Sequence, residues 1–206
     1  ILDGTNFWKT DLSGVDFTVT AKKSYHRTIF TESNLSNSNF EGVNLSPERV
    51  VTSEFKNVKK DIIEAEYSNG LSLLKELGFM GYIEDIGYVG LDNIHIISTE
   101  VHGNDLVVKF AFVNNFAHAN LENANFKNAG LWLVNFYSAN LTNANLSGAD
   151  LRTSFLVNAD LSNANLQGAD ISGVDLSGVD LSGANLDGVI YDQYTILKCI
   201  GHSICV

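Results

Sequence analysis

A five-residue period runs through most of this 206-residue chain and is most regular from Asn114 to Gly188. Each unit holds a small residue, then Asp or Asn, then Leu, Phe or Ile, and finally two polar or small residues, as in Ala139-Asn140-Leu141. Neither an α-helix, with about 3.6 residues per turn, nor a strand, with a period of about two, fits this spacing. The period therefore predicts a solenoid, in which each coil buries its apolar side chains against its neighbours.

The central apolar position is Leu, Phe or Ile in fifteen consecutive units, from Phe116 to Leu186. With this motif, A(D/N)LXX, the chain resembles the pentapeptide-repeat family. The resemblance implies an all-β solenoid, a right-handed quadrilateral parallel β-helix with four units per coil, in which residues twenty apart stack on one side. The interval of eight residues between Phe17 and Tyr25 predicts a bulge or turn. Weaker units centre on Leu2, Phe7, Leu12, Phe17, Tyr25, Phe30, Leu35, Phe40 and Leu45.

The motif is lost between Leu45 and Phe116, which divides the chain into four expected regions. A cap is expected at the C-terminus, because a solenoid end leaves backbone groups unpaired and inner side chains uncovered. Its apolar part is expected from Tyr191, Tyr194 and Ile196. The four regions are N-terminal pentapeptide-like repeats (1–45), a mainly helical α/β insertion (46–113), the regular β-helix (114–188) and the C-terminal cap (189–206).

The insertion begins with signals for a helix. Ser46 suits the N-cap, Pro47 the first turn, and Glu48 the positive end of the helix dipole. Apolar residues then recur at helical spacing, and Asn69-Gly70 would end the helix. We expect its apolar face to pack on the rod, and a second short helix to end at Gly78. The apolar residues of the first helix are Val50, Val51, Phe55, Val58, Ile62 and Ile63, and those of the second are Leu71, Leu73, Leu74 and Leu77.

The last part of the insertion (84–113) has two interpretations. Two β-rich runs, Ile94 to Val101 and Leu106 to Val113, flank four polar residues, which predicts a hairpin. Alternatively, apolar residues at five-residue intervals form degenerate coils in phase with Phe116. They are Ile86, Leu91, Ile96, Val101 and Leu106.

Stacking at twenty residues would align the Asp and Asn side chains into columns. Asp and Asn commonly bond to nearby turn backbone, so we interpret the columns as structural, with an acidic surface as the functional alternative. One column holds Asn120, Asn140, Asp160 and Asp180, another holds Asn125, Asn145, Asn165 and Asn185, and a third holds Asp150 and Asp170.

One region of the rod carries large apolar side chains at outward positions, namely Trp132, Leu133, Tyr137, Phe155 and Val157. Stacking would place Val157 over Tyr137 and Arg152 over Trp132, where a cation–π pair could form. Such a cluster needs covering. The insertion could cover it, or another protein chain could dock there with Trp132 and Tyr137 as anchors.

Both cysteines lie in the tail, at Cys199 and Cys205, with His202 between them. The first hypothesis is a disulfide closing a small terminal loop, which favours an oxidising, extracytoplasmic compartment. The alternatives are two free thiols, or a copper or zinc site with His202 for which no fourth ligand is evident. The other histidines show no ligand spacing and are interpreted as structural or incidental. They are His26, His95, His102 and His118.

No catalytic or cofactor-binding motif is present, so we expect a non-enzymatic structural or interaction scaffold that needs no cofactor and acts through a protein partner. The net charge of −11 disfavours direct nucleic-acid binding, and no segment is apolar enough to span a membrane. The resemblance also suggests a DNA-mimicking regulator of a topoisomerase such as gyrase, although residues 114–188 hold only seven acidic against two basic side chains. A metal-binding protein using Cys199, His202 and Cys205 is the third hypothesis.

Overall fold

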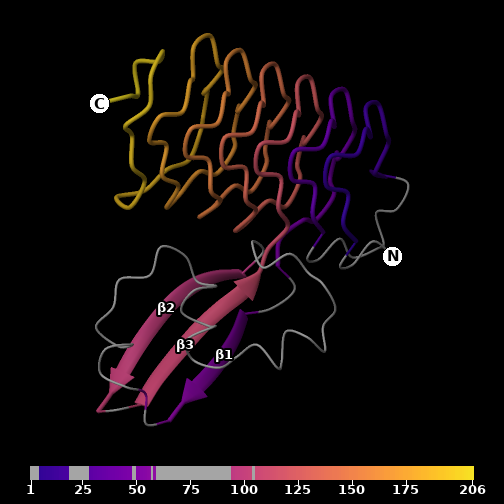
Figure 1. The fold of residues 1–206 in the computed structure, drawn as a ribbon. Helices are drawn as coiled ribbons and strands as arrows, with labels where there is room; N and C mark the ends of the chain where they lie inside the picture. Colours follow the sequence, from indigo (N-terminus) through magenta and orange to yellow (C-terminus); the bar gives the residue numbers. More distant parts are fainter. Residues whose placement is uncertain (1–4, 19–27, 48–49, 57, 59–93, 104) are drawn as a thin grey trace.

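The computed structural model describes residues 5–18, 28–47, 50–56, 58, 94–103 and 105–206. These residues form a rod of stacked coils, with a small antiparallel sheet beside it rather than at either end (Figure 1). Each coil alternates two-residue turns with short extended segments, and each segment contributes a single bridging residue.

Parallel bridges join residues twenty apart along four sides of the rod. The bridging residue occupies the Asp/Asn position of the motif, and the residue after it is the buried Leu or Phe. The rod is therefore a four-sided parallel β-helix, and the predicted columns are confirmed. Its six coils hold the bridging residues 6–16, 29–44, 115–130, 135–150, 155–170 and 175–190. On one inner side, the stacked leucines are no more than 1% exposed; they are Leu121, Leu141, Leu161 and Leu181.

The interior changes from aromatic to aliphatic along the rod. Phenylalanine rings of successive coils stack face to face, with centroids 4.6 Å apart for Phe30 and Phe116 and 4.8 Å for Phe40 and Phe126. Rings on opposite sides meet edge to face, as Phe116 and Phe126 do at 6.3 Å. From Leu141 onward the central positions are leucine or isoleucine, so the N-terminal half carries the directional aromatic contacts.

The rod continues across the insertion. The chain leaves the second coil after Leu45 and returns at Asn114, and the second and third coils then pair at a separation of 86 residues. The paired residues are Ile29 with Asn115, Asn34 with Asn120, Asn39 with Asn125 and Asn44 with Gly130. The ladder is therefore unbroken where the sequence is interrupted.

Within the insertion, three antiparallel strands form a sheet in the order β1-β3-β2. They are β1 (Val50–Phe55), β2 (Ile94–His102) and β3 (Asp105–Phe112). Strands β2 and β3 form the predicted hairpin, so degenerate coils are wrong for these residues. Leu106, Val108 and Phe110 are buried on one face of β3.

The predicted first helix is wrong over Val50–Phe55, which is β1. Val50, Val51 and Thr52 are β-branched and favour extended backbone, and β3 offers them a complete pairing register from Ala111 to Leu106. Strand pairing therefore outweighs the helix-start signals at Ser46, Pro47 and Glu48. The rest of that helix beyond Val58, the second helix and the coil positions Ile86 and Leu91 lie outside the described residues.

Both ends of the rod depart from the regular repeat. Asp11 and Asn34 pair at a separation of 23 residues instead of 20. The bulge or turn predicted between Phe17 and Tyr25 falls mostly outside the described residues. At the other end, Tyr191, Tyr194 and Ile196 are 50%, 72% and 42% exposed, so they do not supply a buried cap. The register there gains one residue, because Asp175 pairs with Ile196, and Tyr194 lies in the turn before Ile196.

Candidate interaction surface

The Asp/Asn columns bond mainly to their own backbone. The side-chain oxygen accepts the N–H of the residue two positions on, as from Ser147 to Asn145 at 3.2 Å and from Ser182 to Asp180 at 2.8 Å. Hydrogen bonds from the Ser182 side chain and backbone also hold the pKa of Asp180 below its ordinary value. The structural interpretation of the columns is therefore confirmed.

Asparagine amides also bond from coil to coil. The Nδ2 of Asn140 donates to Oδ1 of Asn120 at 3.0 Å, and the Nδ2 of Asn145 donates to Oδ1 of Asn125 at 3.3 Å. These amide ladders are neutral. Two sides of the rod are therefore polar without being uniformly acidic.

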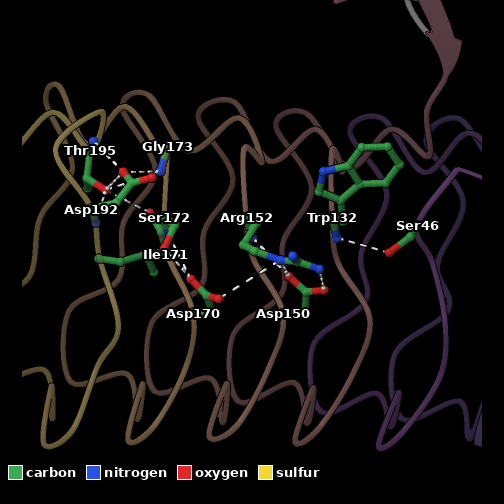
Figure 2. A network of polar contacts seen from close by, with 10 residues as sticks. All are labelled: Ser46, Trp132, Asp150, Arg152, Asp170, Ile171, Ser172, Gly173, Asp192 and Thr195. Atoms are coloured by element: carbon green, nitrogen blue, oxygen red, sulfur yellow. Dashed lines mark hydrogen bonds and ion pairs between the residues drawn. The ribbon is translucent and has the colours of Figure 1, made fainter. Parts of the chain in front are cut away.

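One corner of the rod is altered where the insertion leaves it. Gly130 occupies an Asp/Asn position but has no side chain to accept the N–H of Trp132, and that N–H donates instead to Oγ of Ser46 at 3.0 Å (Figure 2). A Cβ at Gly130 would lie 2.7 Å from Oδ1 of Asn44. The hydrogen bond from Trp132 to Ser46 therefore links the start of the insertion to the third coil.

Arg152 lies one coil further along the same corner and pairs with aspartate. Its Nε and Nη2 donate to the two carboxylate oxygens of Asp150 at 2.8 and 2.7 Å, and Nε lies 3.9 Å from Oδ2 of Asp170 (Figure 2). The Arg152 hydrogen bonds hold the pKa of the Asp150 carboxyl below its ordinary value, against a smaller opposing effect of burial. The guanidinium of Arg152 therefore pairs with carboxylates, and the predicted cation–π pair with Trp132 does not form. Among the described residues, the cation–π pair joins Lys9 to Trp8.

The apolar patch is divided between covered and open residues. Leu133 is 3% exposed and packs with Ala111 of β3 and Val113, while Trp132 and Phe155 lie half-buried against the same cluster. Leu133 has φ of 59°, a region that costs a bulky residue steric strain. Burial against the insertion offsets that strain, so this side of the patch serves to seat the sheet.

Tyr137 remains open at the neighbouring corner. It is 42% exposed, and its ring meets that of His118 edge to face at 5.5 Å. Val157 lies half-buried on the next coil, whose carbonyl accepts from Ser138 N–H at 3.0 Å, as the twenty-residue stacking predicts. Tyr137 is therefore the patch aromatic that a partner could reach.

Sequence reasoning missed an aromatic group at the N-terminal coil. Trp8 is 55% exposed, and Lys9 Nζ lies 4.4 Å from the centroid of its ring. The Nε1–H of Trp8 donates to Oε1 of Glu32 at 3.4 Å. Hydrogen bonds from Trp8 and Lys9 hold the pKa of Glu32 below its ordinary value. Trp8 occupies the same turn position within the five-residue unit as Tyr137, and this position in the sequence could have predicted that its ring is exposed.

The tail cysteines are oxidised to each other. Cys199 and Cys205 form a disulfide, as first hypothesised, so neither offers the thiolate that the copper or zinc alternative needs. His202 Nδ1 accepts the N–H of Ile204 at 3.2 Å. No group of three or more His, Cys, Asp or Glu side chains gathers as a metal site within the described part of the chain.

The preceding turn is fixed by Asp192. Its Oδ1 accepts the N–H groups of Gly173 and Thr195 at 3.0 and 3.1 Å (Figure 2). It also accepts the N–H of Tyr194 at 3.0 Å. Loss of water raises the pKa of this carboxyl, but the hydrogen bonds outweigh that effect and the pKa lies below its ordinary value. Asp192 thus ties the terminal turn to the coil below it.

The sequence pattern of a family described as "Pentapeptide repeats" matches this chain in eight copies, over residues 26–46, 115–152 and 155–190. No curated protein sequence matches it significantly. Among the described residues, no helix is both long and apolar enough to cross a bilayer.

Similar solved structures are pentapeptide repeat proteins. One from Nostoc Pcc 7120 is 36% identical, covering 44% of this chain and 78% of that one, with a TM-score of 0.38. Rfr23 from the cyanobacterium Cyanothece 51142 is 21% identical over 90% of both chains, with a TM-score of 0.25. One from the Arabidopsis thaliana thylakoid lumen is 36% identical over 36% of this chain and 49% of that one, with a TM-score of 0.19. At these TM-scores the superpositions carry no argument about function.

Proposed function

Because this chain belongs to the pentapeptide-repeat family, we propose that it is a non-catalytic scaffold that presents its inserted sheet and the adjoining corner of the rod to a protein partner. The unbroken ladder between the second and third coils carries this proposal. Ile29 bridges to Asn115 and Asn44 to Gly130, on either side of the insertion. The rod therefore holds an added sheet without losing ladder hydrogen bonds.

The attachment of the sheet favours a fixed orientation. Asn114 bonds to Leu45 at the exit from the rod, Trp132 bonds to Ser46, and Leu133 packs on the end of β3. A surface held in one orientation loses less conformational entropy when a partner binds. Rigid presentation is therefore the property that this arrangement supplies.

The partner-facing surface that we propose combines Tyr137 with the exposed apolar side chains of β2. Val101 and Ile97 of β2 are 51% and 39% exposed, and Tyr137 is exposed at 42%. Tyrosine contributes strongly to protein interfaces because it buries a large ring and offers a hydroxyl. Apolar and aromatic contact of this kind suits a protein partner better than a nucleic acid.

A deletion that keeps the rod tests the proposal. Replacing residues 47–112 by a short Gly-Ser link should leave the coils paired, since Asn114 Nδ2 and Leu45 O lie only 2.6 Å apart. Crosslinking in the native source should recover a partner with the full chain and lose it with the deletion. Equal recovery by a deletion variant with an intact circular dichroism spectrum would contradict the proposal.

A point substitution tests the corner separately. Tyr137→Ala should weaken recovery of the same partner, and Thr142→Ala, at the corresponding turn position of the next unit, should not. If both variants bind as the full chain does, the corner is not part of the surface.

A DNA-mimicking regulator of a topoisomerase has less support. Such a surface needs sustained negative charge, whereas the side from Asn125 to Asn185 carries amides and Arg152 offsets Asp150 and Asp170. We expect gyrase supercoiling to be unaffected by this protein. Inhibition or protection at stoichiometric amounts would instead favour the regulator.

A further inference from the structure

The rod ends in a tail that turns back on itself. Ile200 makes the final ladder bonds: its N–H donates to Val179 O, and its carbonyl accepts from Leu181 N–H, both at 2.9 Å. Beyond it, the Val206 N–H donates to Leu197 O at 2.9 Å. Among the described hydrogen bonds this is the one that joins 201–206 to earlier residues, and the Cys199–Cys205 disulfide is the covalent tie.

The tail lies over the apolar end of the interior. Cys199 is 8% exposed and belongs to the continuous core of the rod. Leu197, Ile204 and Cys205 pack, partly buried, against that core, as does Leu186 of the sixth coil. The tail thus covers side chains that the next coil would cover in the middle of the rod.

We propose that this disulfide is a clasp operated by reduction: a dithiol opens it, residues 201–206 come away, and the apolar end of the last coil is exposed. Two observations point to reversible local opening. The tail has one backbone bond to earlier residues, and the loop that the disulfide closes is short, with a separation of six residues. Opening the bond therefore frees the tail and leaves the ladder of the earlier coils intact.

The exchange chemistry has a defined order. Cys205 is the more exposed of the two cysteines, so a thiolate of the dithiol attacks its sulfur and forms a mixed disulfide, while Cys199 leaves as a thiolate and takes up a proton. The second thiolate of the dithiol then attacks the dithiol sulfur of the mixed disulfide, and Cys205 is released as a thiolate that takes up a proton. Two electrons pass to the protein, which gains two thiols, and the dithiol becomes a cyclic disulfide.

The size of the effect follows from loop closure. Without the bond, the chain-entropy cost of closing so short a loop predicts a roughly 10- to 100-fold fall in the ratio of closed to open tail. The cost of exposing Ile204 and Leu197 to water acts in the opposite direction, which keeps the clasp reversible on reoxidation.

Amide hydrogen exchange on the full chain, with and without excess dithiothreitol under native conditions, tests the clasp. Reduction should speed exchange in 201–206 by roughly tenfold or more, leave 140–170 unchanged, and be reversed by reoxidation. The Cys199→Ser/Cys205→Ser double variant should behave as the reduced chain does and should not respond to dithiothreitol.

Three results would overturn the proposal. The first is a disulfide that resists dithiothreitol in the folded protein, as shown by mass after alkylation. The second is reduction without any change in exchange at 201–206, which would mean that packing alone holds the tail. The third is faster exchange along the whole rod, which would make the bond a general staple and not a local clasp.

Discussion

The side-chain amide of Asn114 donates a 2.6 Å hydrogen bond to the carbonyl oxygen of Leu45, 69 residues earlier in the chain. Its Oδ1 accepts the N–H of Thr28 at 2.7 Å, and Asn114 itself is fully buried. One side chain thus fixes the exit from the second coil and the entry to the third. The position is the first of the regular repeat and has no distinguishing sequence motif.

Replacing Asn114 should destabilise the rod at this junction. Asn114→Ala leaves the carbonyl of Leu45 without this buried donor, and it should lower the free energy of unfolding by about 1–3 kcal/mol. Urea unfolding followed by circular dichroism measures the change. Asn114→Asp keeps the oxygen that accepts the Thr28 N–H but removes the donor to Leu45, so it should also lower the free energy of unfolding. If Asn114→Ala is as stable as the parent, the Asn114 hydrogen bonds do not stabilise the junction.

Truncating a central inner leucine should be costly. Leu161 is fully buried between neighbouring coils, so Leu161→Ala should lower the unfolding free energy by roughly 2–5 kcal/mol. Leu186 lies partly buried at the end of the core, and Leu186→Ala should cost clearly less. Equal losses at the two positions would contradict an interior that is tighter in the middle than at the end.

Two serines in the interior offer stabilising substitutions. The Oγ atoms of Ser38 and Ser154 are buried without a hydrogen-bond partner in the described part of the chain, whereas Oγ of Ser33 donates to Phe30 O at 2.5 Å. Ser38→Ala and Ser154→Ala should be neutral or stabilising by up to about 1 kcal/mol, because each removes an unsatisfied buried hydroxyl. Thermal unfolding measures this, with Ser33→Ala as the destabilising control; a loss at Ser38 as large as at Ser33 would count against it.

Acid should weaken the Arg152 corner in a defined direction. The folded-state pKa of Asp150 is lowered, so its stabilising contribution is present above the unfolded-state pKa and is lost as the pH falls through the folded-state value. Arg152→Met should therefore reduce the loss of stability between neutral pH and acid, in denaturant titrations at each pH. An unchanged pH dependence would show that this exposed pair contributes nothing measurable.

The regular rod could be predicted because each part of the motif has a single structural use. The Leu or Phe lies inside, the Asp or Asn bonds to the turn, and the small residue before them fits the crowded interior, as Ala139 and Ala159 do at 1% exposure. Five residues per side then fix the register. The stacking of Val157 on Tyr137 follows from this arithmetic alone.

The insertion could not be predicted in the same way, because its structure depends on distant partners. Ser46, Pro47 and Glu48 carry local helix signals, yet the β-branched residues after them pair with β3, which begins some fifty residues later. Ser46 likewise supplies the acceptor for Trp132 that Gly130 lacks, and it can do so only once the second and third coils are in contact. Such compensation between residues far apart in sequence leaves no local pattern.

The separation between paired coils also bears on the order of folding. Within 115–190 each coil pairs with a neighbour twenty residues away, but the second coil must find the third across 86 residues. Closing the longer loop costs about 1 kcal/mol more in chain entropy, and non-local pairings form late. The C-terminal coils should therefore nucleate the rod and the N-terminal coils should join afterwards, so that growth runs against the direction of synthesis.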